Sequence, residues 1–200
     1  PRLACQRCAS RLPWQWGGQD FCPQCLRRRY CFDRAEALGD YRDEFQQAVL
    51  SMKSLRHEPL TRAMGKLLAR HVADRFAHWG VECGVPVPMH YWRRRRRGTH
   101  TAHVLAEQVA GLLPRPLVDR AWDCRRKSLK QGTLSPRERF QNMRGAFSIA
   151  AGYDINEKRV LLVVDIMTPG ATASEAARTL RRAGAAAVAV AVVARGTGRH

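Results

Sequence analysis

The sequence predicts an α/β protein in which a doubly wound, mostly parallel sheet follows a small cysteine-rich unit. Two runs, residues 160–164 and 185–194, are apolar over the length of a strand, as in strands that helices cover on both faces. A helical pattern lies between them and ends at Gly184. The first residues, about thirty of them, are too few to form an apolar core alone and carry two Cys-x-x-Cys pairs instead.

Length and composition permit one or two globular domains. The chain has 200 residues, of which 45% are hydrophobic, enough to bury a sizeable core. The longest apolar run, 185–194, is too short for a membrane span, and no signal peptide is visible. Seven cysteines, an odd number with several in short pairs, favour a reducing compartment over a disulfide scaffold. We therefore expect a cytoplasmic protein.

The charge is strongly basic, with 35 Lys and Arg against 17 Asp and Glu and a formal net charge of +18. Such an excess favours partners that are rich in phosphate. It is also compatible with an ordinary solvated surface, so the position of the cations has to decide between the two.

The chain opens with Cys5, Cys8, Cys22 and Cys25, two Cys-x-x-Cys pairs separated by thirteen residues. This is the spacing of a zinc ribbon, in which four thiolates close a tetrahedral structural site with no open position. Zinc would then fold the segment, with roughly 10 kcal/mol or more of apparent binding energy. The alternatives are a redox dithiol, which needs only one such pair, or two disulfides. Cys31 could be a spare ligand, but a small buried thiol fits it better.

From Gly39 the pattern becomes helical. Phe45, Val49 and Met52 recur at steps of three and four residues, and a second helix is expected to begin at Pro59 and to run to about Trp79. We therefore expect two domains, the cysteine unit at 1–38 and the α/β domain at 39–200. A polar loop is expected later, at 120–145, before a short strand at 146–149.

A basic loop is expected between a short strand that begins at Val85 and a helix at 102–112. Prolines end the strand, and five consecutive arginines precede Gly98. At the carboxyl end of a strand, such a loop could hold a pyrophosphate or a nucleic-acid backbone, with aromatic rings stacked on bases; the alternative is a basic surface turn. The candidates for pyrophosphate are Pro88, His90, Arg93, Arg97 and Gly98, and those for nucleic acid are Tyr91, Trp92, Arg94, Arg95 and Arg96.

The stretch 160–172 is expected to form a strand, a tight loop and the start of a helix. Amide N–H groups at the start of a helix, aided by its dipole, form a phosphate site, and the carboxylate at the end of the strand could accept hydrogen bonds from sugar hydroxyls. The candidates for this ribose 5-phosphate site are Asp165, Thr168, Gly170, Ala171 and Thr172. The alternative is an ordinary strand-to-helix turn in which Gly170 supplies only backbone freedom.

These residues resemble the signature of type I phosphoribosyltransferases, in which a strand ends in two acidic residues and continues into a Thr-Thr-Gly-Ala-Thr-like loop. The resemblance implies a phosphoribosyltransferase-like sheet and Mg²⁺-dependent binding of phosphoribosyl pyrophosphate. Val164 replaces the first acid, and Pro169 replaces a usual Thr. Because both positions are expected to touch the ligand, we predict weakened binding, which Val164→Asp with Pro169→Thr would strengthen.

Three further motifs resemble the ComF/GntX family over nearly the whole chain. They are the Val-Pro-Val-Pro run at 85–88, the arginine run that ends in Arg97-Gly98, and the segment 129–147. Within the last of these, the residues that match the family pattern are Gln131, Ser135, Arg139, Asn142 and Gly145. The family's two amide side chains are replaced by His100 and Thr101. Arg139 and Asn142 could equally make hydrogen bonds between loop and core.

The resemblance implies a zinc ribbon joined to a phosphoribosyltransferase-type domain, and a cytoplasmic role in the uptake of transforming DNA. The implied partners are the incoming single-stranded DNA and uptake proteins such as a competence helicase. Two functions remain open. One is a phosphoribosyltransferase, hence a glycosyltransferase, acting on phosphoribosyl pyrophosphate or a nucleotide; the other is a non-catalytic single-stranded-DNA-binding or adaptor protein on the same fold. The sequence identifies no acceptor and no catalytic residue.

Overall fold

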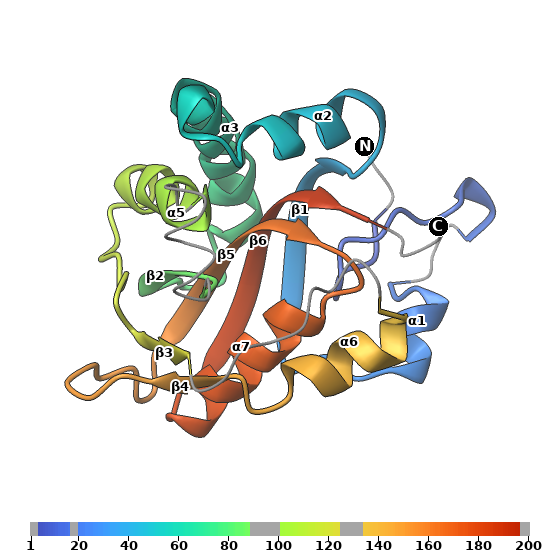
Figure 1. Cartoon of the computed structure of the whole chain (residues 1–200). Coiled ribbons are helices and arrows are strands. Elements are labelled where there is room, and N and C mark those ends of the chain that lie inside the picture. Colours follow the sequence, from blue (N-terminus) through green and yellow to red (C-terminus); the bar gives the residue numbers. More distant parts are fainter. Residues whose placement is uncertain (1–3, 17–19, 89–100, 125–133, 197–200) are drawn as a thin grey trace.

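The computed structural model describes residues 4–16, 20–88, 101–124 and 134–196, and its centre is a parallel, four-stranded sheet (Figure 1). In the order in which they lie side by side, the strands are β1 (Arg34–Asp40), β6 (Ala187–Arg195), β5 (Arg159–Met167) and β2 (Cys83–Pro86). The side chains of β5 and β6 are mostly buried valine, leucine and alanine. The predicted fold class, an α/β protein with a mostly parallel sheet, is confirmed.

Helices cover both faces of the sheet (Figure 1). One face carries α2 (Asp43–Ser51), α3 (Glu58–Phe76) and α5 (Thr101–Leu112), and the other carries α6 (Pro136–Met143) and α7 (Ala171–Arg182). Because side chains alternate along a strand, Leu161 and Val163 pack in the core beside α3 and α5, whereas Leu162 and Val164 pack in the core beside α7. The strand–loop–helix unit expected at 160–183 is therefore present, with strand β5 followed by helix α7.

Shorter elements complete the described part of the chain. They are η1 (Trp14–Trp16), α1 (Pro23–Arg27), η2 (Leu55–His57) and two antiparallel strands, β3 (Trp122–Cys124) and β4 (Phe147–Ile149). The prediction of a polar loop at 120–145 is wrong, because β3 and α6 fall inside this range. The sequence signal for α6 is local: Ser135 and Glu138 form a capping box, with Pro136 at the first helical position.

The first strand of the sheet begins within residues 1–38, the range expected for the cysteine unit. β1 pairs in parallel with β6, from Arg34 opposite Ala189 to Asp40 opposite Arg195. The strand is difficult to recognise from the sequence, because Glu36 and Gly39 interrupt its apolar pattern. The cysteine segment therefore leads directly into an edge strand of the sheet.

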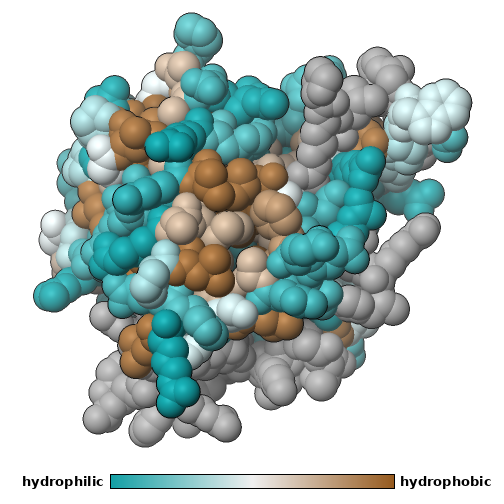
Figure 2. Space-filling model, turned by 90° about the horizontal axis from the view of Figure 1, so that it is seen from above, coloured by the Kyte–Doolittle hydropathy of each residue, from teal (hydrophilic) through white to brown (hydrophobic). Residues whose placement is uncertain are grey.

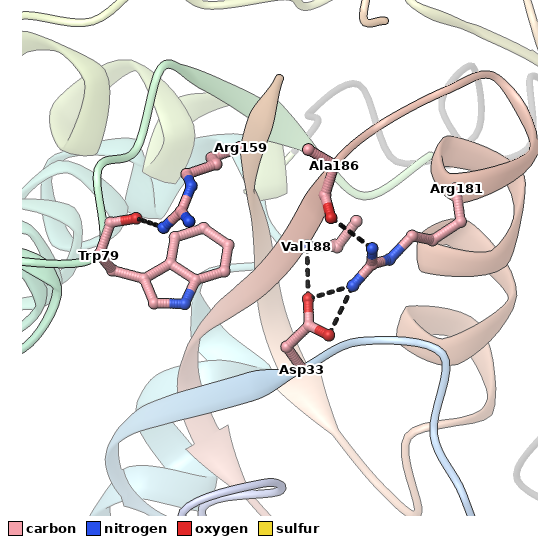
Figure 3. A network of polar contacts seen from close by, with 6 residues as sticks. All are labelled: Asp33, Trp79, Arg159, Arg181, Ala186 and Val188. Carbon is pink, nitrogen blue, oxygen red and sulfur yellow. Dashed lines mark hydrogen bonds and ion pairs between the residues drawn. The ribbon is translucent and has the colours of Figure 1, made fainter. Parts of the chain in front are cut away.

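Two sets of polar contacts lie at the amino ends of the strands (Figure 3). Asp33, immediately before β1, accepts a hydrogen bond of 2.8 Å from the Val188 N–H and forms an ion pair with Arg181 of α7. Arg159, the first residue of β5, donates to the Trp79 carbonyl at 2.6 Å. These contacts hold surrounding segments to the amino end of the sheet. The candidate site lies at the opposite end, where β5 ends.

The face above α2 and α3 carries an apolar area surrounded by hydrophilic side chains (Figure 2). Leu50 of α2, Leu67 of α3 and Leu55, which lies between the two helices, are about half exposed. Among the described helices, none has the length and apolar character that a membrane crossing requires.

Candidate functional site

The candidate phosphate loop consists of residues 168–172, between β5 and the first turn of α7. Gly170 adopts the left-handed conformation, with φ at +101°, and a Cβ atom there would lie 3.1 Å from Cε1 of Tyr30. The Ser174 N–H donates to the Gly170 carbonyl at 2.9 Å and so begins the helix. Within the described ranges, the N–H groups of Gly170 and Ala171 have no protein acceptor. The loop thus has the donors that a bound phosphate requires.

Three successive carbonyl groups, one at the end of β5 and two in the loop, are held by donors from three distant parts of the chain. The pairs are Arg195 Nη1 to Met167 O at 2.9 Å, Arg139 Nη1 to Thr168 O at 3.4 Å, and Tyr30 Oη to Pro169 O at 2.8 Å. Because each carbonyl is occupied by the protein, its orientation is fixed. Tertiary contacts therefore set the conformation of the loop.

The sequence predicts Asp165 at the end of the strand. In the structure, Asp165 lies within β5. Strand pairing continues to Met167, opposite Arg195. The Asp165 carboxylate is half-buried and accepts a hydrogen bond of 2.8 Å from the Ile166 N–H. One oxygen of the carboxylate is thus engaged with the backbone of its own strand, immediately before the phosphate loop.

Val164 does not face a ligand. Its side chain is only 3% exposed and belongs to the core beside α7. The expectation that position 164 touches the ligand is therefore wrong, since strand alternation points this side chain into the apolar interior. A carboxylate here would be desolvated without a partner.

The other residues of the predicted loop differ in how far their side chains are exposed to solvent. Pro169 and Ala171 are buried, whereas Thr168 and Thr172 are half-buried. Ala171 can therefore offer only its backbone to a ligand. The hydroxyl-bearing side chains that remain at the surface of the loop are those of the two threonines.

The start of the basic loop lies beside this site. Pro86 of β2 is paired with Val163 of β5, and the Val87 N–H donates to the Val163 carbonyl at 2.8 Å. The chain thus reaches Pro88 at the carboxyl edge of the sheet, next to the end of β5. The other residues named for pyrophosphate and nucleic acid, 90–98, and Gln131 lie outside the described residues.

The segment that matches the ComF pattern packs against the phosphate loop from α6. Besides its contact with Thr168, Arg139 donates through Nε to the Leu134 carbonyl at 2.8 Å. Gly145, with φ at +70°, donates its N–H to the buried Glu175 carboxylate at 2.7 Å. For Arg139, the structure favours the alternative in which this side chain makes hydrogen bonds between loop and core.

The four clustered cysteines form a group with the dimensions of a metal site. Their sulfur atoms all lie within 4.8 Å of one another, with Cys5 to Cys25 at 3.6 Å and Cys8 to Cys22 at 3.5 Å. A tetrahedral site with metal–sulfur distances of about 2.3 Å places its sulfurs about 3.8 Å apart. All four are buried free thiols, which excludes the two-disulfide alternative for this structure. A metal held here would be structural, because four thiolates leave no open position.

Arg195 supports this assignment independently. It is 1% exposed, and its Nε donates to the Cys8 carbonyl at 2.8 Å. Its Nη1 also contacts the Gly196 carbonyl, whereas Nη2 is buried and has no acceptor among the described residues. A buried cation is unfavourable without a compensating charge. Four thiolates around a divalent cation carry a net charge of −2, so Arg195 is suited to a metal-loaded cluster.

The charge of Arg195 also acts on neighbouring ionisable groups. Hydrogen bonds from the Cys25 and Cys5 thiols, together with this charge, hold the pKa of Cys8 far below its ordinary value. Burial raises the pKa of Tyr30, so that its hydroxyl retains the proton that it donates to Pro169.

Sequence reasoning missed both Arg195 and Tyr30. The only signal was a charged residue at the end of an apolar run and an aromatic residue shortly after the cysteines.

Comparisons with known proteins agree with the sequence motifs. No family model matches the chain. It is 28% identical over 184 residues to competence protein F of Haemophilus influenzae, covering 90% of this chain and 79% of that protein. It is also 28% identical over 174 residues to DNA utilization protein YhgH of Escherichia coli K12, covering 84% and 75%. These relatives confirm the resemblance to the ComF family.

Two solved structures with a similar chain path are phosphoribosyltransferases. A purine phosphoribosyltransferase from Pyrococcus horikoshii matches with a TM-score of 0.47 and 16% identity, over 68% of this chain and 75% of that chain. A hypoxanthine phosphoribosyltransferase from Staphylococcus aureus matches with a TM-score of 0.46 and 14% identity, over 70% and 67%.

Proposed function

Because the chain is homologous over most of its length to competence protein F and to DNA utilization protein YhgH, we propose that it acts in the uptake and processing of DNA. On this proposal, it binds phosphoribosyl pyrophosphate or a nucleotide through a phosphate group at residues 168–172, in the cytoplasm. The observation that carries the ligand proposal is the loop itself, with Gly170 left-handed and with two N–H groups at the start of α7 that have no acceptor in the described part of the chain.

In this proposal the 5′-phosphate accepts hydrogen bonds from the N–H groups of Gly170 and Ala171 and from the Thr172 hydroxyl. The dipole of α7 adds roughly 0.3 to 1 kcal/mol for a charged group at its N-terminus. Asp165 contacts the ribose hydroxyls with the carboxylate oxygen that does not bind Ile166. Mg²⁺ would be held mainly by oxygens of the ligand and by water. With Val164 in the core, positions 164 and 165 supply one acid instead of two, which favours binding over efficient transfer.

The metal proposed for the four cysteines is zinc, since thiolate ligands in a tetrahedral arrangement are typical of structural zinc. Together with α1, these cysteines make up an N-terminal unit that precedes the phosphoribosyltransferase-like domain. We place the division between them before Arg34, because β1 belongs to the sheet.

Titration of phosphoribosyl pyrophosphate with Mg²⁺ into metal-loaded protein, followed by calorimetry, tests the ligand proposal. We expect saturable one-to-one binding that Thr172→Val weakens about tenfold, since a hydrogen bond to a charged group contributes roughly 1.5 kcal/mol or more. Thr179→Val is the matched control, because the Thr179 hydroxyl donates to the Glu175 carbonyl within α7, at 3.0 Å, two turns further on. Absence of binding, or equal effects of the two variants, would refute the assignment of the loop.

A second candidate function is non-catalytic binding of single-stranded DNA, with uptake proteins such as a helicase as partners. The buried Val164 and the net charge of +18 favour it. Each phosphate contact made by Arg93–Arg97 should contribute about 0.7 to the slope of log affinity against log salt concentration. Changing three of these arginines to Ala should therefore lower the slope by about 2. The control is the same change at three exposed arginines elsewhere, Arg56, Arg70 and Arg182; equal slopes in both variants would rule out a role for the arginine run.

A further inference from the structure

We propose that the metal at the four cysteines and the phosphate ligand at residues 168–172 bind cooperatively, through Arg195 and Tyr30. The ligand half of this inference rests on the proposed function. The structural half, that the cysteine site holds the phosphate loop in its conformation, does not.

Arg195 is the direct link between the two sites. One guanidinium group donates to the Cys8 carbonyl at 2.8 Å and to the Met167 carbonyl at 2.9 Å. Cys8 belongs to the first cysteine pair, and Met167 is the last residue of β5 before the loop. Because Arg195 is 1% exposed, its side chain cannot move away from one partner without disturbing the packing around the other.

Tyr30 is the second link. Besides its 2.8 Å hydrogen bond to Pro169, its ring stacks on Phe32, with centroids 4.8 Å apart, and is tilted against Phe140 of α6 at 6.1 Å. A Cβ atom on residue 170 would lie only 3.1 Å from Cε1 of this ring, so the ring packs closely against the glycine turn. Tyr30 follows α1, the five-residue helix that contains Cys25.

The cysteine segment depends on its metal more than the sheet does. A helix as short as α1 is not stable alone, and small segments of this kind gain their folding free energy from the metal. Without the metal, the Cys8 carbonyl is no longer held in place, and the buried Arg195 loses both this acceptor and the thiolate charge. We expect the guanidinium to move toward water and to stop donating to the Met167 carbonyl. Of the two described donors to that carbonyl, the Gly196 N–H at 3.1 Å then remains alone, and the loop loosens.

Thermodynamic linkage requires the effect to be reciprocal. If removal of the metal weakens binding of the phosphate ligand by a given factor, then the ligand must raise the affinity for the metal by the same factor. Couplings of this kind commonly lie between about 5-fold and 150-fold. We expect a value near the lower end, roughly 5-fold to 20-fold, because two hydrogen bonds carry most of the connection.

The structural half is tested without any ligand. Amide hydrogen exchange of the full-length protein is measured with the metal bound and after chelation, for peptides that cover 165–175 and, as a control, α3. We expect exchange in the loop to become at least about tenfold faster without the metal while α3 stays protected. Unchanged protection of the loop overturns the proposal, and so does equal loss of protection in α3, which would mean general unfolding rather than a specific link.

The links themselves are tested with metal-loaded variants. Tyr30→Phe removes the hydrogen bond to Pro169 and leaves the ring in place, and Tyr153→Phe is the control at a tyrosine that is 36% exposed. We expect Tyr30→Phe to retain the metal but to speed exchange in the loop several-fold, while Tyr153→Phe has no effect. Arg195→Lys should act in the same direction as Tyr30→Phe. If neither link variant changes loop exchange, the proposed connection is wrong.

The ligand half is tested by following release of the metal to a chromogenic chelator, with and without phosphoribosyl pyrophosphate. We expect the ligand to raise the apparent metal affinity of the wild type by the factor given above and that of Tyr30→Phe by less. An equal effect in both proteins overturns the coupling. Failure of the ligand to bind the metal-loaded wild type overturns the proposed function, and the exchange measurements then decide the structural half separately.

Discussion

The Tyr30 hydroxyl donates to the Pro169 carbonyl at 2.8 Å and joins residues that are 139 positions apart in the chain. Tyr30 follows the last clustered cysteine, and Pro169 lies in the candidate phosphate loop. The loop is therefore not an independent motif. Its conformation depends on Tyr30, on Arg139 of α6 and on Arg195 of β6, which together hold three successive carbonyls.

The purified protein should contain one zinc ion per chain. Cys8→Ser or Cys22→Ser should abolish retention of the metal, because three thiolates do not complete the tetrahedral site. Cys31→Ser should retain it, since Cys31 lies outside the group and uses its backbone N–H to contact Ser174 at 3.1 Å. Elemental analysis of the three variants measures this; metal loss in Cys31→Ser would contradict the assigned ligands.

Val164→Asp should destabilise the protein and should not improve ligand binding. The side chain is 3% exposed among apolar neighbours, so we expect a loss of about 3 kcal/mol or more in the free energy of unfolding at pH 7. Burial should raise the pKa of the new carboxyl group above its unfolded value. The loss is then smallest below about pH 4 and grows as the pH rises. Urea unfolding at several pH values measures this loss of stability. Val164→Asn, whose side chain is nearly isosteric with Asp, is the uncharged control. Stronger binding of phosphoribosyl pyrophosphate by Val164→Asp would contradict the assignment of position 164 to the core.

Gly170→Ala should destabilise the loop, because residue 170 has φ at +101° and a Cβ atom would crowd Tyr30 at 3.1 Å. We expect a loss of about 1 to 2 kcal/mol in unfolding free energy and a marked loss of ligand affinity. The matched control is Gly111→Ala in α5, where a Cβ atom meets nothing within 4 Å. That change should stabilise the protein by about 0.5 to 1 kcal/mol. Thermal unfolding of both variants measures the difference in sign.

Arg139→Ala should loosen the phosphate loop without unfolding α6. The contact with Thr168 is long, at 3.4 Å, so we expect about a fivefold loss of affinity for phosphoribosyl pyrophosphate, corresponding to about 1 kcal/mol. Arg137→Ala, at an exposed position on the same helix, is the control. Calorimetric titration of the two variants provides the comparison, and identical affinities would show that the contact with Thr168 does not shape the loop.

Glu36 should give the stability a measurable pH dependence. Burial alone raises the pKa of Glu36, but the nearby His71 ring, with Nε2 at 3.7 Å, and a hydrogen bond of 3.0 Å from Arg34 outweigh it, so that the pKa lies below its ordinary value. A lowered pKa in the folded state means that the carboxylate stabilises the protein above the unfolded pKa and that this contribution disappears as the pH falls through the folded value. Glu36→Gln should therefore cost about 1 to 2 kcal/mol at pH 7 and less at pH 3. Denaturant unfolding at both pH values tests this, and a cost that is independent of pH would contradict it.

The sequence by itself determined the local units of this protein. The apolar runs predicted β5 and β6, the loop pattern predicted the turn into α7, and the cysteine spacing predicted a four-sulfur group, which the structure shows with all four sulfurs within 4.8 Å. Each of these is encoded within a short stretch of chain, by hydrophobic periodicity or by ligand spacing. The resemblance to the ComF family likewise came from short motifs.

Only the tertiary structure decided how these units meet. β1 became visible as a strand because it pairs with β6, and Val164 proved to be a core residue because α7 covers that face of the sheet. Arg195 and Cys8, which are 187 positions apart, meet only after the sheet and the cysteine segment have folded against each other. No local pattern specifies such contacts, because a buried guanidinium finds its carbonyl partners through packing and not through sequence spacing.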